Sequence, residues 1–477
     1  MKFEFIKPGE IRTRFAPSPT GFLHIGSCRT ALFNYLFAKK NQGRFILRIE
    51  DTDRERSKSH FEDDIIDNLK WLGIDWDEGP YKQSERQNIY AKYLEKLLKE
   101  EKAYYCFCSG EELESKRQEQ MSRGLPARYN GKCSKLSPKE VEKNLADGKK
   151  FIIRFKVPAK KISFNDMVRG KIEFDTGLMG DASIAKDFSV PLYNFAVVVD
   201  DFEMKISHVI RGEDLLPNTP VQILLQKALG FPQPEYGHLP LILGPDKSKM
   251  SKRHGAVSVA EYKNQGYLPE TLINFLAFLG WNPGTEREIF SLASLIKEFS
   301  IERVQKGGAI FNIKRLDFLN GFYIRQKSLD RLTELCIPYF EDKSAEKNYL
   351  KRIVAIYQER LKKLSEITEL TDFLFKEKLD YDKKLLQWKN MSDEEIGKAL
   401  DELTRLLSDI KDTNWTKENL ENILMPVAER MGDRGCLLWP FRSALTGKEA
   451  SAGPFEIAEI LGKEKTLKRL QEAKNLL

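Results

Sequence analysis

Residues 14–26 read RFAPSPTGFLHIG, and the fold can be worked out from this stretch. It begins inside a short extended run, residues 11–16, and Pro17, Pro19 and Gly21 then exclude a helix before residue 22. A helical pattern follows from Ser27 to about Lys40, and the run FILRI at 45–49 then predicts a second strand that ends at Glu50. Strand, crossover helix and parallel strand form a βαβ unit, and ligands bind at the carboxyl edge of such a sheet.

After this unit the sequence pattern changes to that of an insertion, and buried apolar runs typical of parallel strands appear again after it. Residues 103–190 carry the mixed patterns of an insertion, and buried runs at 195–199, 206–210 and 239–243 predict further strands of the first sheet. Past about residue 325 only helical patterns remain. We therefore predict a doubly wound, Rossmann-like parallel-sheet domain with a mixed α/β insertion, followed by an all-helical C-terminal half. The predicted divisions are 1–102, 103–192, 193–256, 257–325 and 326–477.

The composition is that of a soluble protein with reduced cysteines. The chain has 477 residues, 41% of them hydrophobic, and a mean hydropathy of −0.47. No apolar run approaches the roughly 20 residues that span a bilayer, and the first residues lack the apolar core of a signal peptide. Six cysteines are too few for a disulfide scaffold, so we expect a cytoplasmic protein. The formal charge of +7 permits a polyanionic partner without requiring one.

Two short motifs carry the chemistry. His24 and Gly26 stand at the start of the first predicted helix, where backbone N–H groups and the helix dipole favour a phosphate. The second motif, KSKMSKRHG at 247–255, holds four lysine and arginine residues within seven positions. Such a cluster is either a solvated basic loop or the binding site of an anion.

Together the two motifs resemble the signature sequences of class I aminoacyl-tRNA synthetases. The segments FILRIEDTD (45–53), WDEGPY (76–81), YNFAVVVDD (193–201), HVIRGED (208–214) and ALTG (444–447) resemble those of bacterial-type glutamyl-tRNA synthetases. They follow the family order over nearly the whole chain. The resemblance implies that L-glutamate and ATP form glutamyl-adenylate, and that the glutamyl group then passes to the 3′-terminal adenosine of tRNA(Glu), with tRNA(Gln) as a second or alternative acceptor.

The resemblance also implies roles for individual residues. His24 and Lys252 are the expected catalytic residues against the phosphates, and Gly26, Lys249 and Arg253 complete the ATP site with Mg²⁺. For glutamate, Arg14 and Tyr193 are expected to bind the side-chain carboxylate. Arg211 is expected to bind the α-carboxylate and Glu50 the ammonium group, while Ala16 and Ser18 line the same pocket.

The resemblance further assigns the parts of the chain to tRNA. Residues 103–192 would bind the acceptor stem, 257–325 would contact the stem, and 326–477 would read the anticodon. Residues 132–161 are basic, with Phe151, Arg154 and Phe155 among them, and are expected to meet the acceptor stem together with Arg56. In the helical half the candidate contacts are Arg360, Lys362 and Lys363. We expect a monomer.

Zinc is implied only weakly. Cys106, Cys108 and Cys133 resemble the zinc motif of some family members, but the fourth position is Lys135, whose ammonium group cannot bind a metal. Structural zinc takes four ligands, so the sequence favours the relic of a zinc site over a bound ion.

Three other readings compete with the synthetase. A relative that glutamylates a modified tRNA base would lack the helical half, which is present here. A nicotinamide-dependent enzyme would need Gly-x-Gly-x-x-Gly after the first strand, where this chain has PSPTG. A non-catalytic, synthetase-like RNA-binding or regulatory protein stays open as the alternative, although His24, Gly26 and Lys252 are all intact.

Overall fold

A computed structural model of the chain describes residues 10–477, apart from the side chain of Lys252. The chain divides into two compact units. The first holds residues 10–263 and 269–313, and the second holds 264–268 and 314–477. The five-part division expected from the sequence is finer than this and stays a prediction.

The first unit is built on parallel strands, and the predicted βαβ unit is confirmed. Strand β1 pairs in parallel with β2 and β2 with β3, while β9 pairs in parallel with β10. Strands β1 and β9 are joined where Ser207 N–H donates to Arg12 O at 3.0 Å. The bounds are β1 (Arg12–Phe15), β2 (Arg44–Ile49), β3 (Glu78–Lys82), β9 (His208–Gly212) and β10 (Glu235–Leu239).

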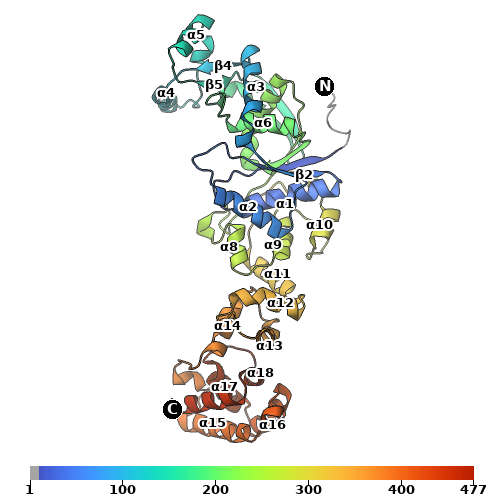
Figure 1. Ribbon diagram of the computed structural model, residues 1–477, viewed down its shortest axis with the longest axis vertical. Coiled ribbons are helices and arrows are strands. Elements are labelled where there is room, and N and C mark those ends of the chain that lie inside the picture. Colours follow the sequence, from blue (N-terminus) through green and yellow to red (C-terminus); the bar gives the residue numbers. More distant parts are fainter. Residues whose placement is uncertain (1–9) are drawn as a thin grey trace. The chain divides into compact units, whose positions relative to one another are not determined.

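Helices cover both sides of these strands, as a doubly wound sheet requires. In Figure 1, α1 and α2 lie on one side of β2, and α3 and α6 lie on the other. The helices of this unit are α1 (Ile25–Lys40), α2 (Ser59–Leu72), α3 (Gln87–Lys99), α6 (Tyr193–Glu203), α7 (Thr219–Leu229), α8 (Val259–Asn264), α9 (Pro269–Ala277) and α10 (Leu292–Glu298). This arrangement puts residues 14–26 at the carboxyl ends of the strands, where the sequence predicted a ligand site.

Two of the predicted strands differ in the structure. The run at 195–199 is wrong as a strand, because it lies inside helix α6. All of Phe195 to Val199 is buried, so the helix has no polar face in this stretch, and an apolar run without periodicity reads equally well as a strand. The run at 239–243 is interrupted after Leu239, where β10 ends. A separate short strand, β11 (Ile242–Leu243), pairs in parallel with β12 (Ala309–Ile310).

The insertion holds two sets of strands. One is an antiparallel sheet of β4 (Ala103–Cys106), β5 (Ile152–Phe155) and β8 (Ala182–Ala185). The other is the antiparallel hairpin of β6 (Lys161–Asp166) and β7 (Gly170–Asp175). Strand β6 also pairs with β10 at Asp166 and Tyr236, so the hairpin extends the sheet of the first unit. Two exposed helices, α4 (Gly110–Ser122) and α5 (Pro138–Ala146), complete the insertion.

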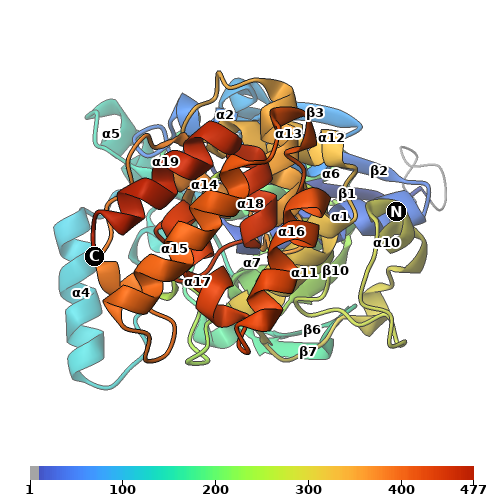
Figure 2. The ribbon, with the colours of Figure 1, turned by 90° about the horizontal axis from the view of Figure 1, so that it is seen from below.

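The second unit is helical throughout its described residues, as predicted. Leu350, Leu403, Leu424 and Phe441 belong to its single buried core. Figure 2 shows α14, α15, α17 and α19 from below. The helices are α11 (Ile313–Arg325), α12 (Leu329–Cys336), α13 (Lys347–Tyr357), α14 (Glu366–Phe375), α15 (Asp393–Ser408), α16 (Lys417–Arg430), α17 (Gly435–Thr446), α18 (Pro454–Leu461) and α19 (Lys463–Lys474).

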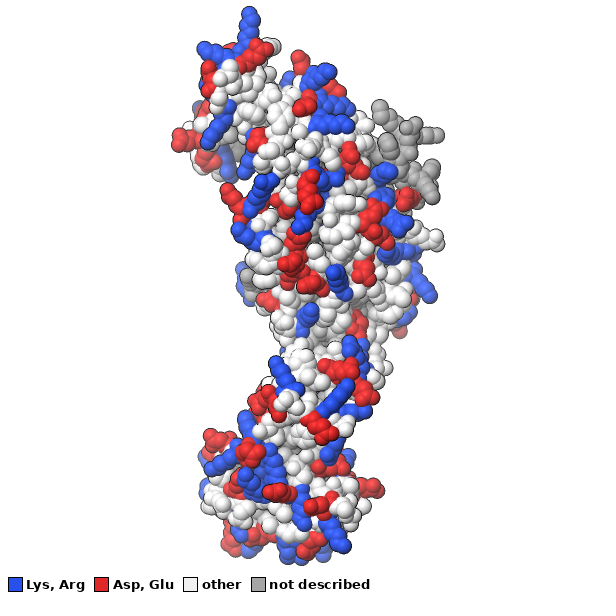
Figure 3. Space-filling view, in the orientation of Figure 1, with Lys and Arg blue, Asp and Glu red and all other residues white. Residues whose placement is uncertain are grey.

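Both units carry a mixed surface. Figure 3 shows lysine and arginine interspersed with aspartate and glutamate over the visible face of each unit. Among the described residues, no helix combines the length and the apolar character needed to cross a bilayer.

Candidate active site

A cavity of about 420 Å³ lies at the carboxyl ends of β1, β2 and β9, next to the start of α1. It brings together most of the residues that the sequence singled out. Arg14 and Ala16 come from the end of β1, Glu50 from the end of β2, and Arg211 from β9. The predicted residues that line it are Arg14, Ala16, Ser18, His24, Gly26, Glu50, Tyr193, Arg211 and Lys249.

Behind Arg14 and Glu50 lies a buried network of charges. Arg14 Nε donates to Asp201 Oδ1 at 3.1 Å. Arg48 is fully buried and donates both to Asp201 Oδ1, at 2.8 Å, and to Glu50 Oε1, at 3.0 Å. Although burial acts to raise it, Arg14 and Arg48 hold the pKa of Asp201 below its usual range. Both cavity residues are therefore held by the pair Arg48 and Asp201, which the sequence analysis missed.

Glu50 is placed to receive a cation. It is 6% exposed, and burial raises the pKa of its carboxyl although Arg48 acts in the opposite direction. Arg48 therefore does not fully offset the desolvation of this carboxylate. A second cation on the cavity side, such as an ammonium group, would stabilise its ionised form.

Arg211 is held differently, by neutral groups. Its Nε donates to His238 Nε2 at 3.1 Å and its Nη2 to Thr219 Oγ1 at 2.8 Å. Its Nη1 is buried and has no hydrogen-bond partner among the described residues. Because Arg211 lines the cavity, this nitrogen has its hydrogen-bonding capacity left for a ligand.

His24 caps helix α1 and faces the cavity as a neutral donor. Its Nδ1 accepts from Gly26 N–H at 2.9 Å, so the neutral ring carries its proton on Nε2. Burial, and then the nearby Lys249 ammonium, lower the pKa of His24 and favour this neutral form. A Cβ atom at position 26 would lie 3.2 Å from His24 Nδ1, which explains why glycine suits this position.

The basic loop 247–255 is only partly turned toward the cavity. Lys249 lines the cavity and lies 3.5 Å from Asp214 Oδ2. Arg253 is not among the lining residues, because its Nη2 binds Ser248 Oγ at 2.6 Å and Asp246 Oδ2 at 3.2 Å within its own loop. Lys252 begins a short turn, Lys252–His254, and its side chain lies outside the described residues.

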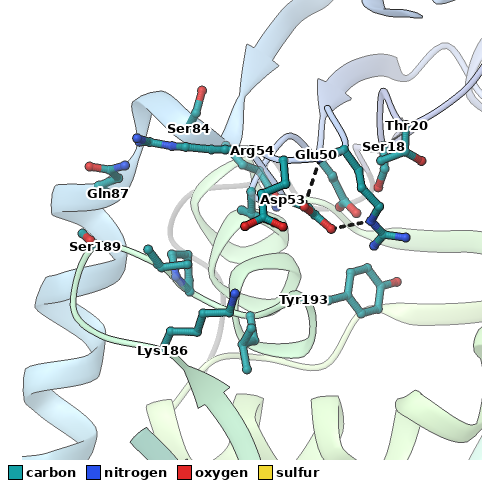
Figure 4. A pocket seen from close by; sticks show the side chains of 17 residues that line it. Ser18, Thr20, Glu50, Asp53, Arg54, Ser84, Gln87, Lys186, Ser189 and Tyr193 are labelled. Carbon is teal, nitrogen blue, oxygen red and sulfur yellow. Dashed lines mark hydrogen bonds and ion pairs between the residues drawn. The ribbon is translucent and has the colours of Figure 1, made fainter. Parts of the chain in front are cut away.

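A second cavity, of about 770 Å³, adjoins the first and shares Ser18, Glu50 and Tyr193 with it. Figure 4 shows Lys186, from the segment after β8, pointing into this cavity next to Tyr193, while Glu50 lies farther away, near Asp53 and Ser18. Arg54 and Arg56 also line it, and Arg56 Nε pairs with Asp53 Oδ2 at 2.7 Å. The larger cavity therefore has basic side chains as well as the acidic Glu50, Asp53 and Glu55, and it adjoins the smaller one.

The three cysteines of the insertion meet a fourth donor that the sequence analysis missed. The Sγ atoms of Cys106, Cys108 and Cys133 lie within 4.8 Å of one another. Tyr129 Oη lies 3.4 Å from Cys106 Sγ and 3.5 Å from Cys108 Sγ. Bonds of about 2.0–2.3 Å to a tetrahedral metal separate the ligand atoms by roughly 3.5–3.7 Å. The two distances from Tyr129 and the 3.6 Å between Cys108 Sγ and Cys133 Sγ are close to this spacing.

The expected tRNA contacts in the insertion are wrong for two residues. Arg154 is 7% exposed, and its guanidinium lies 4.0 Å from the centre of the Tyr129 ring. Phe155 is 2% exposed and belongs to the core. Both lie on the central strand β5, so their alternation with basic residues reflects strand packing. In the second unit, Arg360 Nη1 binds Ser451 O at 2.6 Å.

Comparison with known proteins matches both units. The catalytic domain of class I tRNA synthetases (E and Q) matches residues 10–318, and an anticodon binding domain matches residues 331–474. Glutamate–tRNA ligase 1 of Caldicellulosiruptor saccharolyticus is 48% identical over 97% of this chain and 98% of its own. Glutamate–tRNA ligase of Aquifex aeolicus is 46% identical, with the same coverage. A crystal structure of a glutamate tRNA ligase from Elizabethkingia meningosepticum, in complex with its amino acid, covers 98% of this chain and 100% of its own, with a TM-score of 0.87 and 35% identity.

Proposed function

This chain belongs to the glutamate–tRNA ligases of class I, and we propose that it activates L-glutamate with ATP and transfers the glutamyl group to the 3′-terminal adenosine of tRNA(Glu). In the first step a carboxylate oxygen of glutamate attacks the α-phosphorus of ATP and pyrophosphate leaves. In the second step a ribose hydroxyl of the adenosine attacks the carbonyl carbon, and AMP leaves.

The charge of the smaller cavity carries this proposal. Arg14 and Arg48 are matched by Asp201 and Glu50, and the nearby Asp200 is paired with Arg86 at 2.8 Å. Arg211 forms no ion pair among the described residues, and its buried Nη1 has no hydrogen-bond partner, so this positive charge has no direct counterion. Free glutamate carries one net negative charge at neutral pH and glutamine carries none. A buried site with this charge binds the first and rejects the second.

We assign the groups of glutamate accordingly. Arg14 and Tyr193 bind the side-chain carboxylate, Arg211 Nη1 binds the α-carboxylate, and Glu50 binds the ammonium group. Ala16 and Ser18 line the remaining wall. Each assignment is supported by a position on the smaller cavity. The assignment of Glu50 is further supported by its need for a second cation.

We assign the phosphates to the residues at the start of α1 and to the basic loop. His24 donates from Nε2 to a phosphate oxygen, and Gly26 leaves room for the nucleotide. Lys249 and Lys252 approach from the loop, and Arg253 joins them once it leaves Asp246. Mg²⁺ bound with ATP supplies charge neutralisation for the leaving pyrophosphate. Transfer at phosphorus depends chiefly on such positioning and charge stabilisation, so no protein nucleophile is required.

We assign the 3′ end of the tRNA to the larger cavity and the anticodon to the second unit. The larger cavity adjoins the amino-acid site and presents Arg54, Arg56 and Lys186 to a phosphate backbone. The match of residues 331–474 to an anticodon binding domain supports the second assignment.

We also propose that Cys106, Cys108, Tyr129 and Cys133 hold a structural zinc ion. The sequence analysis disfavoured zinc because Lys135 occupies the fourth position. Tyr129 Oη removes that objection, since its phenolate is an anionic oxygen donor and it lies 3.4–3.5 Å from two of the thiols. The ion would join the start of α4 to the segment before α5 and would take no part in the reaction.

The experiment is charging of purified tRNA(Glu) and tRNA(Gln), separately, with glutamate and ATP. Charging that is lost in Lys252→Ala supports the synthetase. Charging of tRNA(Glu) alone identifies a discriminating enzyme, and charging of both tRNAs identifies a non-discriminating one. If neither tRNA is charged, the catalytic proposal fails, and the non-catalytic RNA-binding protein takes its place.

A further inference from the structure

A chain of buried polar groups runs from strand β6 of the insertion to Arg211. Asp166 Oδ2 lies 2.6 Å from His238 Nδ1, and His238 Nε2 lies 3.1 Å from Arg211 Nε. Thr219 Oγ1 closes the group, at 3.1 Å from His238 Nε2 and 2.8 Å from Arg211 Nη2. His238 and Thr219 are fully buried, and Asp166 and Arg211 are each 3% exposed.

Chemistry fixes where the protons lie in this chain. A guanidinium group only donates, so His238 Nε2 must accept from Arg211, and the ring proton then lies on Nδ1 and is donated to Asp166. Asp166 is itself fixed, because its Oδ1 accepts from the backbone N–H groups of Val168 and Arg169, each at 2.9 Å. The hairpin turn between β6 and β7 therefore sets the orientation of the imidazole ring.

The consequence is that Arg211 is oriented without being neutralised. Arg14 is bound directly to the carboxylate of Asp201, whereas two neutral side chains, His238 and Thr219, hold Arg211. The carboxylate of this hydrogen-bonded group, Asp166, lies on the other side of the imidazole ring from Arg211. Among the described residues Arg211 forms no ion pair, and its buried Nη1 has no partner. An arginine kept in place but uncompensated is suited to pair with a carboxylate that arrives from outside.

We propose that Asp166 and His238 are positioning residues that orient Arg211 for the α-carboxylate of glutamate. The proposal rests on the role given above to Arg211. Asp166 belongs to the β6–β7 hairpin of the predicted acceptor-stem insertion. The affinity for glutamate would therefore depend on that hairpin.

The test compares Michaelis constants in the charging assay, with glutamate, ATP and tRNA varied in turn. Asp166→Asn sets an amide N–H against the backbone donors or against His238, and His238→Phe removes the acceptor for Arg211. We expect both to raise KM for glutamate at least tenfold and to leave KM for ATP within about twofold. His238→Gln, whose amide oxygen can accept from Arg211, should stay within about threefold of the wild type. His208→Gln, a change at another histidine of the same sheet, is the matched control and should leave all three constants unchanged.

Three results would overturn the proposal: an unchanged KM for glutamate in His238→Phe, an equal rise of KM for glutamate and ATP, or a His238→Gln variant no better than His238→Phe. If His238→Phe does not fold, Thr219→Val replaces it, with an expected severalfold rise of KM for glutamate only, and an unchanged value there counts against the proposal. Arg211→Lys distinguishes a failure of the role assigned to Arg211 from a failure of the positioning role of Asp166 and His238. If that variant keeps the wild-type KM for glutamate, the assigned role of Arg211 fails; if it raises KM while Asp166→Asn and His238→Phe do not, the positioning chain alone fails.

Discussion

Arg14 and Arg211, the residues proposed to bind the two carboxylates of glutamate, lie in opposite electrostatic settings. Asp201 holds Arg14 through Nε at 3.1 Å and Nη2 at 3.5 Å, so Nη1 is the nitrogen of the planar group that has no bond to Asp201. Lysine cannot reproduce this, because its single ammonium cannot serve Asp201 and a ligand in the same geometry.

We therefore expect Arg14→Lys and Arg14→Ala to raise KM for glutamate by roughly 30-fold or more, as truncation of a buried charge pair costs about 2–5 kcal/mol. Discrimination against glutamine should fall in parallel, because the excess positive charge is reduced or displaced. Steady-state charging with each amino acid measures both effects. Arg44→Ala is the control, since Arg44 opens β2 with 56% of its side chain exposed. A variant at Arg14 that keeps the wild-type KM for glutamate would contradict the proposed role of Arg14 in glutamate binding.

His208 gives a prediction about stability rather than activity. Burial lowers the pKa of His208 to about 4, against about 6.5 in the unfolded chain. Between these values the unfolded chain binds a proton that the folded chain does not, so stability falls as the pH falls from 6.5 toward 4. At pH 5 the loss is about 2 kcal/mol. Urea unfolding of the wild type and His208→Asn at pH 7 and pH 5 should show a smaller pH effect in the variant. Equal pH effects in both proteins would contradict the low pKa.

Sequence reasoning found the residues that face the ligand and missed those behind them. His24, Arg14 and Arg211 stand at the ends of recognisable strands and helices, where position alone suggests function. Arg48 lies within an apolar strand and His238 within a short buried strand, and nothing local distinguishes a buried anchor from a surface charge. Only the partners across the sheet, more than a hundred residues away in the case of Asp201, reveal what these side chains do.

At the scale of elements, the same limit explains why the sequence predicts a strand where helix α6 lies. The run from Phe195 to Val199 is wholly apolar and three of its five residues are the β-branched valine, and a helix buried on all sides shows no periodicity to contradict a strand. The functional side chains of this helix lie at its two ends and not in the apolar run. Tyr193 opens the helix at the cavity wall, and Asp200 and Asp201 near its end supply the carboxylates for Arg86, Arg48 and Arg14.

The cysteine cluster yields a prediction for the insertion as an element. Elemental analysis of the purified chain should find about one zinc per molecule. Tyr129→Phe should lose the ion to a chelator that leaves the wild type loaded, because a three-ligand structural site is incomplete. Loss of zinc should also lower the melting temperature, since binding of a structural ion contributes directly to folding. Lys135→Ala is the matched control and should retain the ion. A wild-type chain without zinc, or a Tyr129→Phe variant that keeps it under the same challenge, would contradict the site.

At the scale of the whole molecule, the described residues on the face drawn in Figure 3 form no continuous basic surface that would attract tRNA. The formal excess is +7, and cations and anions are interspersed on the view of Figure 3. On the proposed function, local clusters supply the phosphate contacts, and the proposed ones are Arg54, Arg56 and Lys186 on the larger cavity. Three such contacts predict that KM for tRNA rises about 20- to 40-fold when the salt concentration increases fourfold. KM for glutamate should change far less, because its charges are buried and screened weakly.

When the salt series is run with both tRNAs, it also distinguishes binding through phosphate contacts from recognition of the tRNA bases. Phosphate contacts are alike for tRNA(Glu) and tRNA(Gln), so added salt should weaken both by the same factor. A preference read from bases by the second unit would therefore keep a constant ratio of kcat/KM across the series. A ratio that moves toward one with increasing salt would mean that the preference comes from different numbers of phosphate contacts. In that case the helical unit would hold the tRNA by its charge, and its assignment as the reader of the anticodon would fail.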